Sequence, residues 1–256
     1  MEHALSRLEM LVGQGALDQL AKARVAVFGL GGVGGYAVEA LARCGIGALD
    51  LTDHDTISMS NLNRQILATC SSVGRLKVEL ARERIREINP KCEVRTHQTF
   101  FLPETADQFD FQNYDYVIDA VDTVTAKLLL ASMAQETNTP IISAMGTGNK
   151  LHPELLEVAD IYQTSVCPLA RIMRKECRKR GIRSLKVVYS REEPQIPTAV
   201  ADAGAEMKTV TEPDRTESIF GQKRAVPGSA VFVPATAGLI LAAEVVRDLI
   251  CRNAIQ

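Results

Sequence analysis

A glycine-rich stretch and the carboxylate that follows it are the first features of this sequence that could bind a ligand. GLGGVG at 29–34 ends the apolar run RVAVFGL, which predicts a buried strand that enters a tight turn. Because glycine has no side chain, the backbone of this stretch can approach a phosphate chain at the N-terminus of the next helix. The glycines concerned are Gly29, Gly31, Gly32 and Gly34. Asp53 ends the next predicted strand, where it could accept hydrogen bonds from ribose hydroxyls. The pattern predicts a nucleotide site but leaves NAD, FAD and ATP open.

Polar residues downstream of this loop favour a nucleotide whose phosphates react. Arg64 and Lys77 could neutralise the charge that develops when the α-phosphate of ATP is attacked. Asn61 and Asn63 could act as neutral orienting groups. Asp122, just past a fourth predicted strand, could hold Mg²⁺ on the phosphates. A dehydrogenase has no obvious need for this set, although solvated charges on a helix would explain Arg64 and Lys77 taken singly.

Strands alternate with helices through the first 150 residues, which predicts a mostly parallel sheet with helices on both faces. The expected strands are Arg24–Leu30, Ala48–Thr52, Val94–Gln98, Tyr114–Ala120 and Pro140–Ala144. The expected helices are Val33–Cys44, Gly74–Ile88 and Val124–Thr137. We therefore expect an α/β fold of the doubly wound, Rossmann-like class.

The second half of the chain is less regular. Its expected elements are a strand at Leu155–Gln163, a basic helix at Pro168–Gly181, a strand at Leu185–Ser190, a long mobile loop at 191–228 and a closing helix at Thr236–Cys251. We expect a single domain over 1–256. Residues 1–150 would form its nucleotide-binding half, and residues 151–256 an elaborated half for substrate binding and dimerisation.

Composition narrows the functional classes. Hydrophobic residues make up 46% of the chain, charged residues 23%, and the net charge is −2, so any attraction to nucleic acid must be local. None of the six cysteines forms a Cys-x-x-Cys pair, which argues against a zinc ribbon. The N-terminus lacks the pattern of a signal peptide, and no apolar stretch is long enough to span a membrane without charges. A cytoplasmic protein without stable membrane insertion is expected.

Four segments carry a resemblance to a known family. GLGGVG, DHDTISMSNLNRQI, GRLKVELARERIREINP and VIDAVDTVTAK resemble the ThiF-like adenylyltransferases, which are relatives of the ubiquitin-activating enzymes. The resemblance covers roughly residues 5–150 and 229–250. It implies that a substrate carboxylate attacks the α-phosphate of ATP, giving an acyl-adenylate and pyrophosphate.

The same resemblance implies a role for each matching residue. The four glycines would cradle the nucleotide and Asp53 would bind its ribose. Asn63, Arg64 and Lys77 would contact the phosphates, and Asp122 would hold Mg²⁺. Arg7 matches an N-terminal arginine that the family supplies to the ATP of a partner subunit, so the resemblance also implies a homodimer. Alternatively, Arg7 has no role in the site and is a surface residue of an N-terminal helix.

The stretch TSVCPLARIMRKECRKRGIRSLKVVYSREEP is similar to the branch of the family that dehydrates threonylcarbamoyladenosine in tRNA. This implies activation of the threonyl carboxylate of N6-threonylcarbamoyladenosine at position 37, followed by loss of AMP and ring closure. Cys167 stands where an acidic residue is common in that branch. Cys167 or Cys177 could form a transient acyl-enzyme, but packing explains both more simply.

Charge in this stretch agrees with a nucleic-acid partner. Between Arg171 and Arg191 nine residues are basic and one is acidic, which suits a phosphate backbone. A solvated helix face or an acidic protein partner would explain the charge as well. The residues expected to contact tRNA are Arg171, Arg174, Lys175, Arg178 and Lys179.

Two other functions stay open at this point. One is a ThiF-like activator of a ubiquitin-like sulfur-carrier protein, which the missing Cys-x-x-Cys pairs and the basic stretch disfavour. The other is a non-catalytic NAD-sensing module, which Arg64, Lys77 and Asp122 disfavour. A sulfur-transfer protein partner also remains open.

Overall fold

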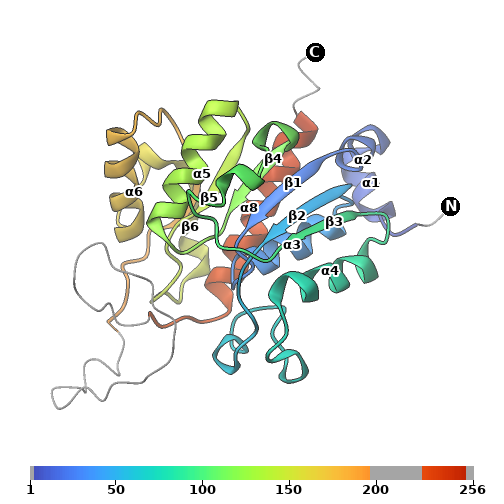
Figure 1. The fold of residues 1–256 in the computed structure, drawn as a ribbon, viewed down its shortest axis with the longest axis horizontal. Helices are drawn as coiled ribbons and strands as arrows, with labels where there is room; N and C mark the ends of the chain where they lie inside the picture. The colour runs from blue at the N-terminus through green and yellow to red at the C-terminus, as the bar shows by residue number, and fades with distance from the viewer. Residues whose placement is uncertain (1–2, 197–226, 252–256) are drawn as a thin grey trace.

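The computed structural model describes residues 3–196 and 227–251, and a seven-stranded β-sheet forms the centre of this part of the chain (Figure 1). The strands are β1 (Arg24–Phe28), β2 (Ala48–Thr52), β3 (Glu93–His97), β4 (Tyr116–Asp119), β5 (Ile141–Ala144), β6 (Leu156–Asp160) and β7 (Lys186–Ser190). Their order across the sheet is β3-β2-β1-β4-β5-β7-β6. All neighbouring pairs are parallel except β6 with β7. The predicted α/β, mostly parallel, Rossmann-like class is confirmed.

Helices cover both faces of this sheet. They are α1 (Ser6–Val12), α2 (Gln14–Leu20), α3 (Gly34–Arg43), α4 (Lys77–Ile88), α5 (Val124–Thr137), α6 (Pro168–Lys179) and α8 (Phe232–Cys251). Successive side chains of β1 face opposite layers of helices. Val25 and Val27 belong to the core shared with α3, α4 and α8. Ala26 and Phe28 pack against α5 and a phenylalanine cluster. A β-strand buried on both faces reads as such a continuous apolar run.

The closing helix α8 packs closely on α3. A Cβ placed on Gly238 would lie 2.3 Å from the carbonyl oxygen of Val33 and 2.9 Å from Tyr36 Cβ. Only glycine permits this approach, which brings the first turns of α8 next to the glycine-rich loop. No described helix, α8 included, is long and apolar enough to cross a membrane.

Several element boundaries differ from those expected. The helix predicted from Gly74 begins at Lys77, because Gly74 has a positive φ of 85° and Leu76 forms a bridge with Thr56. The closing helix begins at Phe232, with Pro234 in its first turn, where a proline is tolerated. The strand predicted over 155–163 is shorter and antiparallel to its neighbour. The loop predicted over 191–228 falls mostly outside the described residues.

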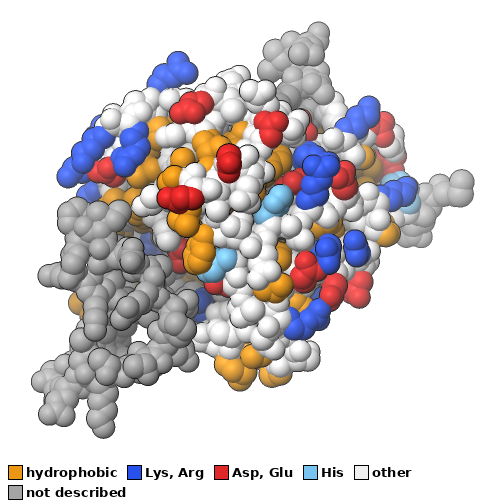
Figure 2. Space-filling view, in the orientation of Figure 1, with side chains coloured by type: hydrophobic (Ala, Val, Ile, Leu, Met, Phe, Trp, Pro, Cys, Tyr) orange, Lys and Arg blue, Asp and Glu red, His pale blue; other side chains and the backbone are white. Residues whose placement is uncertain are grey.

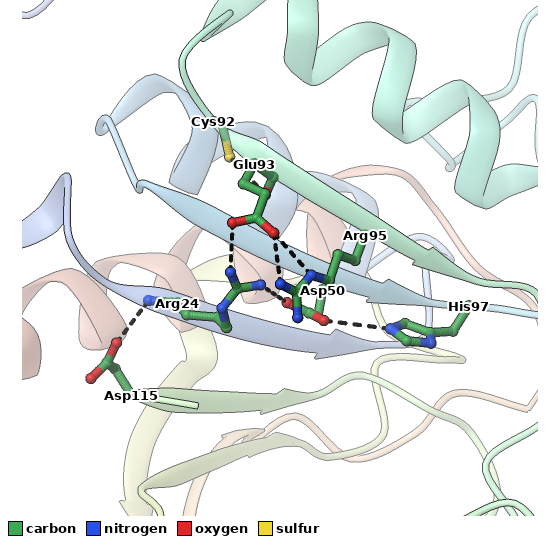
Figure 3. A network of polar contacts seen from close by, with 7 residues as sticks. All are labelled: Arg24, Asp50, Cys92, Glu93, Arg95, His97 and Asp115. Atoms are coloured by element: carbon green, nitrogen blue, oxygen red, sulfur yellow. Dashed lines mark hydrogen bonds and ion pairs between the residues drawn. The ribbon is translucent and has the colours of Figure 1, made fainter. Parts of the chain in front are cut away.

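A network of ion pairs joins β1, β2 and β3 (Figure 3). Arg24 donates from Nη1 to Asp50 Oδ2 and from Nη2 to Glu93 Oε2, each at 2.7 Å. His97 Nε2 lies 3.4 Å from the other oxygen of Asp50. Burial raises the pKa of Asp50, but the hydrogen bonds from His97 and Arg24 outweigh it, and the pKa is lowered overall. The ionised carboxylate therefore stabilises this part of the sheet.

Candidate nucleotide-binding site and basic helix

The glycine-rich loop connects β1 to α3 at the carboxyl edge of the sheet. Gly29 has a φ of 90°, and a Cβ there would lie 2.6 Å from the carbonyl oxygen of Ala120. A Cβ on Gly34 would lie only 1.8 Å from the carbonyl oxygen of Gly29. These two glycines are therefore required by the turn itself and by the contact between α3 and the sheet.

The two central glycines have a different environment. For Gly31, the nearest atom to an added Cβ is Gln65 Nε2, 4.0 Å away, so this position faces open space. For Gly32, the nearest atoms are Pro234 Cβ at 3.3 Å and the carbonyl oxygen of Arg64 at 3.4 Å. The loop is open at Gly31, where a phosphate could approach, and is bordered at Gly32 by Arg64 and the start of α8.

Asp53 fastens this loop to the end of β2. Its Oδ2 accepts a hydrogen bond from the backbone N–H of Leu30 at 2.7 Å, and its Oδ1 accepts one from the N–H of Asp55 at 2.8 Å. The side chain is buried. An ionised carboxylate has about four lone-pair sites, so Asp53 can still accept a ribose hydroxyl while it holds the loop.

Lys77 stands at the start of α4 and is nearly inaccessible, with 4% of its surface exposed. Its Nζ donates to Asp55 Oδ2 at 2.6 Å and lies 3.8 Å from Asp53 Oδ1. The structure thus brings Lys77 to Asp53 as the sequence suggested, and adds Asp55. Sequence reasoning missed Asp55, although its place two residues after Asp53 was a signal.

The residues between Ser58 and Arg64 divide into two roles. Asn61 is buried, and its Oδ1 accepts the backbone N–H of Ser58 at 3.1 Å, which closes a local turn. Asn63 is exposed and donates from Nδ2 to the carbonyl oxygen of Ser229 at 2.8 Å. Arg64 donates from Nη1 to Ser60 O at 2.7 Å and to Asn63 Oδ1 at 3.1 Å. Asn61 therefore supports the backbone, while Asn63 and Arg64 present polar groups beside the glycine loop.

Asp122 lies just beyond the carboxyl end of β4 and its side chain is exposed. A buried network that the sequence did not reveal supports this turn. Lys127, 1% exposed, lies 3.1 Å from the buried carboxylate of Asp119 and donates to the carbonyl oxygen of Ala144 at 2.7 Å. Ser143 donates to Asp119 at 2.5 Å, and Asp119 accepts the N–H of Val121 at 3.2 Å.

Arg7 is not brought together with the other predicted site residues. Arg7 is exposed on α1. Leu5, two residues before it, packs against Gly45. Gly45 follows α3, whereas the glycine loop precedes it. A helix of ten residues is about 15 Å long, so Arg7 lies near the opposite end of α3 from the loop.

Helix α6 carries the basic residues predicted to contact tRNA, and blue side chains gather over it in Figure 2. Arg171 and Lys175 are exposed, as expected for a binding face. Arg174 is half-buried and donates to the carbonyl oxygen and hydroxyl of Thr164 at 2.6 and 2.7 Å. Arg174 therefore fastens α6 to the preceding segment in addition to carrying charge.

Other basic residues of this stretch also have partners, some within α6 and some outside it. Arg178 lies over the ring of Tyr162, 5.3 Å from its centroid. Lys179 pairs with Glu176 at 2.8 Å, and the hydrogen bonds from Lys179 and Arg180 lower the pKa of that carboxyl to about 2. Lys186 pairs with two acidic residues of α8. Lys186 therefore contributes less to the basic surface, whereas Arg178 and Lys179 stay exposed on α6.

The two cysteines near this helix are packing residues. Cys167 and Cys177 are both buried, with 2% and 0% of their surface exposed. Burial raises the pKa of the Cys177 thiol to about 11, which disfavours a nucleophilic thiolate. All six cysteines of the chain are unpaired.

Comparison with known proteins agrees with this geometry. The model of the ThiF family matches residues 5–254. This chain belongs to the ThiF family.

Relatives within the ThiF family match almost the whole chain. A tRNA threonylcarbamoyladenosine dehydratase of Bacillus subtilis is 40% identical over 251 residues, which cover 98% of this chain and 96% of the relative. The protein of the same name in Escherichia coli is 34% identical, over 96% of this chain and 93% of the relative. The crystal structure of E. coli tRNA N6-threonylcarbamoyladenosine dehydratase, TcdA, in complex with ATP superposes with a TM-score of 0.84. It is 31% identical and covers 99% of this chain and 96% of that one.

Proposed function

We propose that this chain is an ATP-dependent tRNA threonylcarbamoyladenosine dehydratase. Its substrate would be N6-threonylcarbamoyladenosine at position 37 of tRNA, and its product the cyclic form of that nucleoside. The observation that carries the proposal is the similarity to dehydratases of this name over 98% of the chain. That similarity extends through α6 and β7, where an enzyme acting on another carboxylate would be expected to differ.

The glycine loop and its neighbours account for the ATP side of the reaction. The N-terminus of α3 and the open position at Gly31 suit the phosphate chain, and Asp53 suits the ribose. The threonyl carboxylate attacks the α-phosphorus, and the bond to the β-phosphate oxygen breaks to release pyrophosphate. Arg64 and Lys77 stabilise the negative charge that develops on the phosphates during this step.

Ring closure needs no protein nucleophile. A nitrogen of the threonylcarbamoyl group attacks the activated carbonyl carbon, its proton is lost, and AMP leaves with the oxygen. The water formally removed is thus accounted for by cleavage of ATP to AMP and pyrophosphate. The burial of Cys167 and Cys177 is in keeping with this direct route.

Asp122 fits a Mg²⁺ ion held jointly by the protein and the phosphates. Its carboxylate is exposed at the carboxyl edge of the sheet, and Mg²⁺ in nucleotide sites is commonly bound by one or two carboxylates with the phosphates. When bound, the ion would neutralise phosphate charge. Asp119 and Lys127 fix the turn from which Asp122 projects.

The tRNA is expected to lie over α6, with Arg171 and Lys175 contacting its phosphates. A homodimer would let Arg7 reach the nucleotide of the neighbouring subunit, since it lies far from the glycine loop of its own chain. Residues 1–150 would then form the nucleotide-binding half, and residues 151–256 the half that serves tRNA and dimerisation.

Pyrophosphate release with different acceptors tests the function. The purified chain should release pyrophosphate from ATP when given tRNA that carries threonylcarbamoyladenosine, but not unmodified tRNA. Mass spectrometry of the digested tRNA should find a nucleoside lighter by one water. Release only with a carrier protein ending in Gly-Gly would overturn the proposal and favour activation of a sulfur carrier.

A further inference from the structure

The turn after β5 makes a specific contact with the segment that leads into α8. Asn149 has a positive φ of 59°. Its backbone N–H donates to the carbonyl oxygen of Gly228 at 2.7 Å, and its Oδ1 accepts the N–H of Gly228 at 2.6 Å. Next to it, a Cβ on Gly148 would lie 2.9 Å from Pro227 Cβ, so the two segments are in close contact.

This contact continues into the nucleotide site through hydrogen bonds. The carbonyl oxygen of Ser229, the residue after Gly228, accepts from Asn63 Nδ2 at 2.8 Å. Asn63 Oδ1 in turn accepts from Arg64 Nη1 at 3.1 Å. An unbroken chain of contacts therefore runs from Asn149 to the guanidinium of Arg64, whose carbonyl oxygen and Cγ border the glycine loop at Gly32.

Asn63 depends on this contact for its orientation. Its side chain is exposed, and among the described residues it hydrogen-bonds to the backbone of Ser229 and the side chain of Arg64. An exposed amide without a fixed partner would sample several rotamers, and each would place Arg64 differently. The position of residues 228–229 therefore fixes the Asn63 amide, which holds the Arg64 guanidinium together with the carbonyl oxygen of Ser60.

We propose that Asn149 is a positioning residue for the nucleotide site. It holds Gly228 and Ser229 so that the Ser229 carbonyl orients Asn63 and, through it, the Arg64 guanidinium toward the phosphates of ATP. The inference rests on the proposed function for the identity of the ligand. It adds that the turn after β5, in the second half of the sheet, controls phosphate binding in the first half.

Two substitutions separate this role from a local structural one. Asn149→Gly keeps the left-handed backbone conformation, which glycine adopts freely, but removes the Oδ1 acceptor. Asn149→Asp keeps an acceptor at the same place. We expect Asn149→Gly to weaken ATP binding about fivefold to tenfold in the full-length protein, as measured by isothermal titration calorimetry. Asn149→Asp should bind ATP within about twofold of the wild type, and both variants should melt within a few degrees of it.

Asn63→Ala supplies the decisive comparison. If Asn149 acts through Asn63, the double variant should bind ATP no more weakly than Asn63→Ala alone, because residues that act as a unit are not additive. Full additivity, or wild-type affinity in Asn149→Gly, would overturn the inference. The two proposals can fail separately. If ATP binds with the expected coupling but modified tRNA gives no pyrophosphate release, the proposed function is wrong and the role of Asn149 is still supported.

Discussion

The four glycines of the loop should respond differently to the same substitution. Gly34→Ala places a methyl group 1.8 Å from the carbonyl oxygen of Gly29, so backbone must move. Gly31→Ala places one in open space, with Gln65 Nε2 the nearest atom at 4.0 Å. The first substitution should therefore damage the fold, and the second should damage the phosphate site.

The expected magnitudes follow from these contacts. Overpacking costs about 1–3 kcal/mol and more where backbone blocks the added atom, so we expect a loss of about 3 kcal/mol for Gly34→Ala. In a chain of this length that lowers Tm by about 6–12 °C. Gly31→Ala should leave Tm unchanged or raise it slightly, because its methyl meets open space and glycine loses more backbone entropy on folding than alanine. Its methyl would push a phosphate away from backbone donors, and losing one charged hydrogen bond, worth about 1.5–3 kcal/mol, weakens ATP binding about tenfold or more.

Thermal denaturation and calorimetric titration with ATP measure the two effects separately. Gly34→Ala should melt early, and Gly31→Ala should melt normally but bind ATP weakly. If Gly31→Ala bound ATP as tightly as the wild type, the open side of the loop would not be the phosphate site. If Gly34→Ala melted normally, the close contact with Gly29 would not constrain the turn.

Three further predictions concern other parts of the molecule. Lys77→Ala should abolish ATP-dependent pyrophosphate release without changing the far-ultraviolet circular dichroism spectrum, and retained release would remove Lys77 from the phosphate site. Asp50→Asn should lower the free energy of unfolding in urea at pH 7 by about 2 kcal/mol. The pKa of Asp50 is lowered in the fold, so this advantage exists above the unfolded value of about 3.9 and disappears as the pH falls through the folded value. If the difference in unfolding free energy between the wild type and Asp50→Asn grew as the pH fell, Asp50 would not be a carboxylate with a lowered pKa. Reversing Arg171 and Lys175 to Glu should weaken tRNA binding and reduce its salt slope by about 2, whereas Arg86→Glu on α4 should change neither.

The sequence predicted the fold well where local patterns determine it. The apolar run of β1, the glycines at 29–34 and the helix stop after α4 are short-range signals, and each element lies where it was expected. Boundaries were less accurate because they depend on contacts between distant residues. The start of α4 is set by the bridge between Thr56 and Leu76, which neither residue reveals alone.

The site was predicted only in part, because some of its contacts also join residues that are distant in the sequence. Asp53 and Lys77, which the sequence assigned to one nucleotide site, lie 3.8 Å apart because α4 begins at the sheet edge where β2 ends. The partnership of Lys127 with Asp119 could not be predicted, because a lysine on an apolar helix normally faces solvent. Nor could the sequence separate Lys186, which pairs with Asp248 of α8, from the basic residues of α6. Charge counted along a chain takes no account of the direction in which each side chain points.

The two cations that we propose for the nucleotide site are not equivalent, and this bears on the Lys77→Ala experiment. Within residues 3–196 and 227–251, Arg64 bonds only to carbonyl oxygens, so no carboxylate neutralises its charge. Lys77 is buried and paired with Asp55 at 2.6 Å. A phosphate can approach Arg64 without breaking an ion pair, whereas it must compete with Asp55 for Lys77. Binding energy from Arg64 is therefore available in the ground state, and that from Lys77 only after Asp55 turns away. Loss of Lys77 should consequently reduce turnover far more than ATP affinity, and loss of Arg64 should reduce both.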